Sequence, residues 1–135
     1  MAVQPLSPDI LNVIALWPQQ AQQHLLTARA IAFEVADANP ATELTESLKW
    51  GEPAWRPLKG GTTLRMSWKA DRSAIGLFVD CKTDLCVRMQ SDFPDAFDYD
   101  APRALYLASS AALPKKALRH LAEMTFRYKR VLPVA

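Results

Sequence analysis

The chain has 135 residues, of which 50% are hydrophobic and 22% are charged, and its net charge is +2. This length and composition predict a single domain over residues 1–135, with a core from about residue 19 to 130, that needs no metal or disulfide to fold. The small net charge argues against nucleic acid as a partner, because nucleic-acid binders usually carry a strongly basic face.

The sequence shows no signal for a membrane. No apolar run approaches the roughly 18 residues that a membrane-spanning helix needs, and no basic segment followed by a hydrophobic one opens the chain. We therefore expect a cytoplasmic protein that makes no contact with a membrane.

Two helices are predicted in the first third of the chain. Ser7, Pro8 and Asp9 provide a capping hydroxyl, a proline suited to a first turn and an early acid, so we expect a helix over residues 7–17. A longer helix is expected over residues 19–38, where apolar side chains recur at intervals of three and four.

About five strands are predicted in the middle of the chain from alternating patterns or short apolar runs. Pro57 cannot donate a ladder hydrogen bond, so the segment before it is expected at the edge of the sheet. Gly76 lies in the most apolar of these runs and predicts a bulge or the close approach of a side chain such as Trp50. The expected strands cover residues 47–50, 54–56, 63–68, 74–79 and 104–108.

The remaining segments are turns and two further helices. Gly60 and Gly61 predict a hairpin turn, because they supply the positive φ that such turns need. Residues 82–93 fit both a strand and a helix, and we expect the helix. A final helix should begin near Pro114, with one apolar stripe and an opposite basic face that either keeps the surface soluble or meets an acidic partner. That basic face carries Lys115, Lys116, Arg119 and Arg127.

The stretch from Glu46 to Pro57 holds two tryptophans, one glycine and two prolines in twelve residues. Gly51 allows a sharp turn there. Trp50 and Trp55 either anchor helices onto the sheet or line a ligand cleft. Our leading hypothesis is a binding or accessory module that recognises an unknown small molecule or protein, through a cleft formed by Lys49, Trp50, Glu52, Trp55 and Arg103.

No catalytic or cofactor motif is present in the sequence, so we predict neither an enzyme nor a bound cofactor. His24 and His120 fall on separate predicted helices. Cys81 and Cys86 are five residues apart, which matches neither a redox pair nor a common zinc spacing, and both are expected to be buried thiols. Exposed apolar faces on the terminal helices could support a homodimer.

One group of residues resembles a known family. Glu46, the run Lys49–Gly51, Pro53 and Trp55 match the pattern of the YdhG-like domain family of unknown function, and the likeness covers most of the chain, from about Gln19 to Tyr128. The resemblance implies an α+β two-layer sandwich similar to frataxin, in which terminal helices pack on a twisted, mainly antiparallel sheet. The order of the predicted elements agrees with that fold class.

Some members of that family are described as frataxin-like iron chaperones, so the resemblance also implies an alternative function. Iron would be held by surface carboxylates. The acids between residues 92 and 100 are equally consistent with a solvated turn, since they lack the spacing of a calcium loop. The candidate iron ligands are Glu43, Glu46, Asp92, Asp95, Asp98 and Asp100.

Overall fold

The computed structural model describes residues 4–38 and 41–129. Within them the chain forms four α-helices and one antiparallel sheet with six strands in the order β1-β2-β3-β4-β6-β5. The predicted α+β class is confirmed. The helices are α1 (Pro8–Ile14), α2 (Gln19–Asp37), α3 (Leu85–Asp92) and α4 (Lys115–Phe126), and the strands are β1 (Leu44–Lys49), β2 (Glu52–Pro57), β3 (Leu64–Lys69), β4 (Ala74–Phe78), β5 (Asp98–Asp100) and β6 (Ala104–Ala108).

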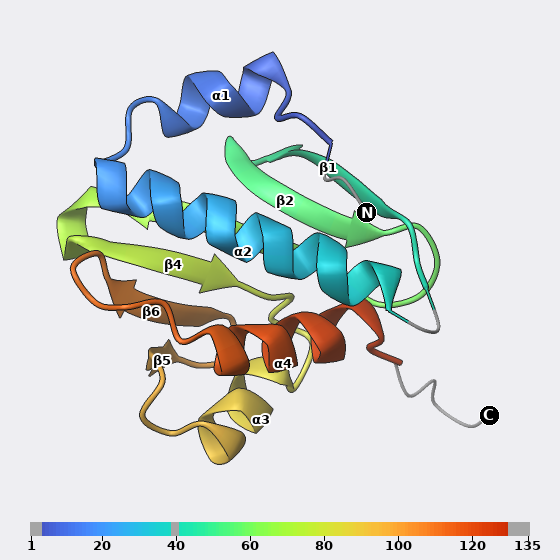
Figure 1. Cartoon of the computed structure of the whole chain (residues 1–135). Coiled ribbons are helices and arrows are strands. Elements are labelled where there is room, and N and C mark those ends of the chain that lie inside the picture. The colour runs from blue at the N-terminus through green and yellow to red at the C-terminus, as the bar shows by residue number, and fades with distance from the viewer. Residues whose placement is uncertain (1–3, 39–40, 130–135) are drawn as a thin grey trace.

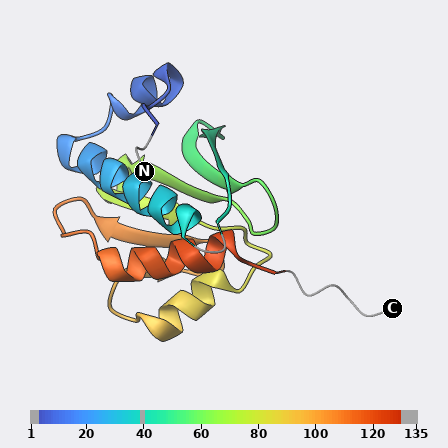
Figure 2. The same cartoon turned by 45° about the vertical axis from the view of Figure 1, so that its right-hand side comes forward.

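Helices α2 and α4 lie side by side over one face of the sheet (Figures 1 and 2). Buried residues of α1 and α3 join the same hydrophobic core. No helix in the described residues covers the opposite face, which we call the open face of the sheet. Within the described residues, no helix is both long enough and apolar enough to cross a membrane.

The predicted helices form close to their expected bounds. The hydroxyl of Ser7 accepts a hydrogen bond from the backbone N–H of Ile10 at 3.4 Å, as expected for the cap of α1. Helix α2 begins at the predicted residue, and the expected stop at residues 39–40 lies outside the described residues. The predicted helix in the ambiguous segment 82–93 is confirmed for Leu85–Asp92, where Leu85 and Met89 both point into the core.

Two predictions about the sheet were wrong. Strand β2 is not at the edge: it lies between β1 and β3, because Pro57 is its last residue and Ala54 and Trp55 pair with β3. The sheet also has a sixth strand, β5, in the acidic segment expected to be a turn. Tyr99 of β5 packs toward the core, whereas Asp98 and Asp100 of the same strand face outward. The strand was not predicted because its sequence is mostly polar.

The two-residue repeat of each strand assigns its side chains to one face or the other. Leu64 and Met66 of β3 are buried under the helices, whereas Arg65, between them, lies on the open face with Lys69. In β6, the two leucines point into the core, and Tyr106 takes the open face. The pairing register then places Arg65 directly opposite Phe78.

Position 76 has to be glycine because the ring of Phe78, and not that of Trp50, takes the space that a side chain would need. A Cβ atom at Gly76 would lie 2.5 Å from Cζ of Phe78 and 3.2 Å from Cε1 of Tyr106. The Phe78 ring therefore lies across the glycine, two residues away on the same strand and the same face. The expected close approach is confirmed, but its predicted partner was wrong.

We expect Gly76→Ala to lower the free energy of unfolding by about 1–3 kcal/mol, because the added methyl group displaces the Phe78 ring. Urea denaturation measures this loss. The matched test repeats the substitution in a Phe78→Ala background, where it should cost much less. An equal loss in both backgrounds would show that the ring does not set the requirement for glycine.

Candidate functional site

The open face of the sheet carries a pocket of about 520 Å³ that we call the sheet-face pocket. It contains four cations, three acids and two aromatic rings, contributed by strands β2 to β6 and by the β3–β4 and β5–β6 connections. Its charged side chains therefore sum to +1. Its lining residues are Glu52, Arg65, Lys69, Asp71, Arg72, Phe78, Asp100, Arg103 and Tyr106.

Glu52 holds two of the cations in place. One oxygen of its carboxylate accepts a hydrogen bond from Nη1 of Arg65, and the other accepts one from Nζ of Lys69 at 2.9 Å. The two cations are four residues apart on β3, and Glu52 reaches both from β2. Because Glu52 is only 8% exposed, these charge-assisted bonds are shielded from competing water.

The ring of Phe78 contacts the same two cations, and the ring of Tyr106 contacts a third, Arg72. Cζ of Arg65 lies 5.3 Å and Nζ of Lys69 lies 5.0 Å from the centroid of the Phe78 ring. Arg72 stacks on Tyr106 at 4.0 Å, and the two rings meet edge to face with centroids 6.1 Å apart. These distances are within the range of attractive cation–π contacts, so three cations of the pocket are positioned by the fold itself.

Arg103 differs from the other three cations. Its guanidinium makes no hydrogen bond or ion pair with any residue that the structure describes, and the side chain is exposed. The ion pair of Arg72 is long, with 3.9 Å between its Nη2 and Oδ2 of Asp100. This side of the pocket therefore has cationic donors available for a ligand.

Beside the sheet-face pocket lies a smaller hollow of about 140 Å³, which we call the hairpin hollow. Arg65 lines both cavities. The backbone N–H of Val79 donates to the carbonyl of Arg103 at 2.9 Å, so the two cavities adjoin at the same end of β3 and β4. The hairpin hollow is lined by Lys49, Trp50, Thr62, Thr63, Arg65, Val79 and Asp80.

The five predicted ligand-binding residues do not form one cleft, because four of them line two adjoining cavities and the fifth lies in the core. Glu52 and Arg103 line the sheet-face pocket, and Lys49 and Trp50 line the adjoining hairpin hollow. Trp55 cannot contribute to either cavity, because its side chain is fully buried under the helices. Its inclusion in a cleft was wrong, while its alternative role as a core anchor is confirmed.

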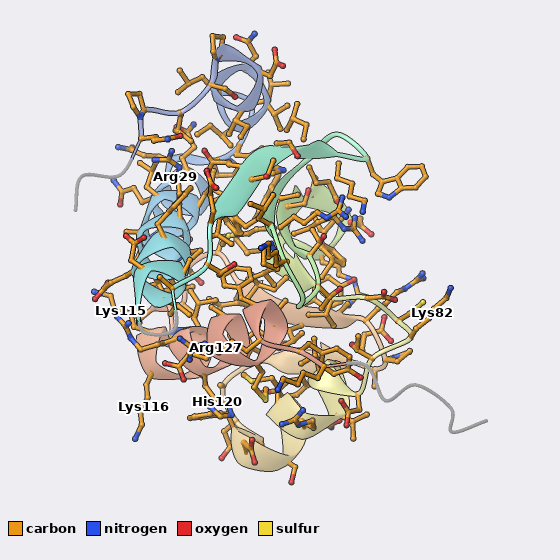
Figure 3. All side chains as sticks on the ribbon, turned by 90° about the vertical axis from the view of Figure 1, so that its right-hand side faces the viewer. Arg29, Lys82, Lys115, Lys116, His120 and Arg127 are labelled. Atoms are coloured by element: carbon orange, nitrogen blue, oxygen red, sulfur yellow. The ribbon has the colours of Figure 1, made fainter. Side chains whose placement is uncertain are left out.

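Trp55 belongs instead to a buried network around Glu46. Indole Nε1 of Trp55 donates to Oε2 of Glu46 at 2.8 Å, and Arg29 of α2 donates to both oxygens of the same carboxylate, at 2.6 and 2.9 Å. Figure 3 shows Arg29 beside α2, on the opposite side of the molecule from Lys82. Glu46 therefore ties α2 to the sheet and is not the surface carboxylate that the iron alternative assumed.

Trp50 occupies the turn between β1 and β2, and its side chain is 84% exposed. Its φ is 56° and that of Gly51 is 74°, so both turn residues are left-handed. Turns of this kind favour Asn-Gly, because asparagine tolerates a positive φ better than a bulky residue does. The interpretation of Trp50 as a core anchor was wrong.

The other acids considered as iron ligands are dispersed. Oδ2 of Asp92 lies 3.1 Å from Nε2 of His120, and Asp100 lies in the sheet-face pocket. Glu43, Asp95 and Asp98 are exposed at separate places along the chain. In the described part of the chain, no three Asp, Glu, His or Cys side chains come together as a metal site would require.

The basic face of α4 is partly neutralised by neighbouring elements. Arg119 pairs with Glu34 of α2 at 3.2 Å, and Arg127 donates to the carbonyl of Ala38 at 3.5 Å. Lys115 and Lys116 lie near the start of the same helix (Figure 3). The cations of α4 therefore face several different neighbours and do not converge on one cavity.

The two cysteines differ in their surroundings. Cys86 is buried, and burial is the main cause that raises the pKa of its thiol, opposed by the hydrogen bond to the carbonyl of Ala104. Cys81 is exposed, so the prediction that it is buried was wrong. A thiol with a raised pKa is a poor nucleophile at neutral pH.

A further hollow of about 540 Å³ lies at the C-terminal end of α4. Leu58, Gly61 and Phe126 form part of its wall. Two of its lining residues, Ala41 and Lys129, stand at the ends of the described ranges. The fixed and converging charges are found at the sheet-face pocket, and we take that pocket as the candidate site.

Sequence reasoning missed most of the pocket. Arg65 was visible only as a polar residue of an alternating strand, and Lys69 as part of the expected turn after it. Tyr106 belonged to a strand whose inward side the sequence left open, and Phe78 to an apolar run. The signal that could have found them is the combination of two cations and an aromatic residue on the outward side of neighbouring strands.

No known protein family, curated protein or solved structure matches the chain. The resemblance to the YdhG-like family therefore stays a prediction.

We expect Glu46→Gln to lower the free energy of unfolding by about 3–5 kcal/mol, because it leaves the guanidinium of Arg29 buried without a countercharge. Glu43→Gln is the matched control: it removes an exposed acid next to the same strand and should change stability by less than about 0.5 kcal/mol. Urea denaturation compares the two variants. Similar small losses in both would contradict the structural role of Glu46.

Trp50→Asn is expected to raise the free energy of unfolding by about 1 kcal/mol, because asparagine accepts the left-handed turn conformation that tryptophan resists. Thermal and urea unfolding measure the gain. Trp50→Ala removes the same indole but keeps the backbone strain, so its stability should stay near that of the wild type. A loss of stability in Trp50→Asn would show that the exposed indole supports the fold.

Proposed function

We propose that this chain is a small binding module whose sheet-face pocket holds an anionic ligand, a carboxylate or a phosphate, without catalysis of its own. The observation that carries this proposal is the exposed guanidinium of Arg103, which has no hydrogen bond or ion pair with any described residue and lies beside three cations that the fold already positions. Arginine presents a planar set of donors that matches the two oxygens of a carboxylate or phosphate.

Preorganisation supports this function. Glu52 and the two aromatic rings hold Arg65, Lys69 and Arg72, so a ligand loses little free energy in ordering them. The single carboxylate of Glu52 leaves the pair of cations that it binds with a net positive charge. An anion in the pocket therefore gains attraction without displacing the internal ion pairs.

We also propose that the fold is the frataxin-like sandwich that the YdhG-like resemblance implies. Support comes from the element order, with two helices before a single antiparallel sheet and a closing helix after it. The packing of α2 and α4 on the same face of that sheet agrees with this arrangement (Figure 1).

Amide NMR titrations with inorganic phosphate and with malonate, at constant ionic strength, test the proposed function. We expect shifts around Arg65, Arg72 and Arg103 that sodium chloride does not reproduce. Arg103→Gln should weaken binding by about tenfold or more, which corresponds to the loss of a charge-assisted hydrogen bond.

Arg56→Gln is the matched control for the titration. Arg56 is an exposed cation of β2 that does not line the pocket, so its neutralisation removes the same charge from the same sheet. Its affinity should stay within about twofold of the wild type, since exposed charges at a distance are screened by salt. Equal losses in the two variants, or no shifts with either anion, would refute the pocket as an anion site.

A further inference from the structure

Trp50 is the one tryptophan of the chain that the fold does not pack. Trp17 and Trp55 are at most 9% exposed, and Trp68 is half-buried against the core, whereas Trp50 is 84% exposed. The left-handed conformation of Trp50 adds strain to this exposure of a large apolar surface. Strain of this kind persists mainly where a residue has a function.

The position of the indole indicates what that function is. Trp50 stands at the tip of the β1–β2 hairpin, which curls away from the rest of the sheet (Figure 2), and β2 pairs with β3 through only Ala54 and Trp55. The tip forms one wall of the hairpin hollow. The hollow has a volume of about 140 Å³ and is open to solvent.

The remaining lining of the hairpin hollow is mostly polar and includes one carboxylate, that of Asp80. Thr62 and Thr63 bring hydroxyl groups from the loop before β3, and Lys49 brings an ammonium group that makes no ion pair with any described residue. Arg65 belongs to this lining and to that of the sheet-face pocket. A ligand can therefore touch both cavities at once.

We infer that the ligand of the sheet-face pocket carries a flat aromatic ring next to its anionic group, and that this ring stacks on the indole of Trp50. This inference rests on the proposed function, because the anion anchors the ligand near Arg65 and Arg103. The same chemistry is found in nucleoside monophosphates and in simple aromatic phosphates or carboxylates. Stacking of a ring on an exposed aromatic side chain strengthens binding by about tenfold to hundredfold.

The test compares anions with and without an aromatic ring. Inorganic phosphate is compared with phenyl phosphate and adenosine monophosphate, and acetate is compared with phenylacetate, by NMR titration of the whole chain. Acrylamide quenching of tryptophan fluorescence gives a second measurement, because Trp50 is the tryptophan most open to the quencher. Acrylamide is uncharged, so it does not compete for the cations.

We expect at least one ring-bearing ligand to bind about tenfold more tightly than its ring-free partner and to protect Trp50 from acrylamide. Trp50→Asn should remove this advantage while binding phosphate or acetate as the wild type does, and Trp50→Phe should keep most of it. Tighter binding of adenosine monophosphate than of phenyl phosphate would identify a nucleotide, and the reverse would identify a simple aromatic anion.

Two results would overturn the inference, and they can be told apart. Equal affinities for ring-bearing and ring-free ligands, with binding still lost in Arg103→Gln, would refute the stacking on Trp50 and leave the anion site intact. No binding of any of the five ligands would refute both the anion site and the ring subsite.

Discussion

In the described part of the chain, helices cover only one side of the sheet, and the rest of the structure depends on this constraint. Helices α2 and α4 bury one face, and the two-residue repeat of the strands then commits every second side chain to the core and every other one to the open face. Apolar residues such as Met66 and Leu77 have to lie beneath the helices. Charged residues of the same strands, such as Arg65 and Lys69, can gather only on the opposite face.

Two glutamates of the β1–β2 hairpin illustrate the consequence. Glu46 lies under the helices, where its carboxylate accepts bonds from Arg29 and Trp55 and joins α2 to the sheet. Glu52 lies on the open face, where its carboxylate accepts bonds from Arg65 and Lys69. Each carboxylate binds two partners, but the first stabilises the fold and the second organises a pocket.

The open face also explains two residues that are costly for the fold. Gly76 leaves room for the Phe78 ring, which in turn lies near the cations of the sheet-face pocket. Trp50 accepts an unfavourable turn conformation and exposes its indole beside the same group of charges. Both features leave the core unaffected and shape the surface around Arg65, which is where we place the ligand.

The sequence by itself determined the α+β class, the four helices and five of the six strands, because periodicity and capping act over a few neighbouring residues. It also drew attention to residues 46–57. It could not assign Trp50 and Trp55 to different sides, since both are large aromatics that either environment accepts. Only the tertiary structure decided that Glu46 anchors α2 to the sheet, that β2 is internal, and that Glu52 meets Arg103 in one pocket. Strand order and the side that the helices cover depend on contacts between residues far apart in the chain.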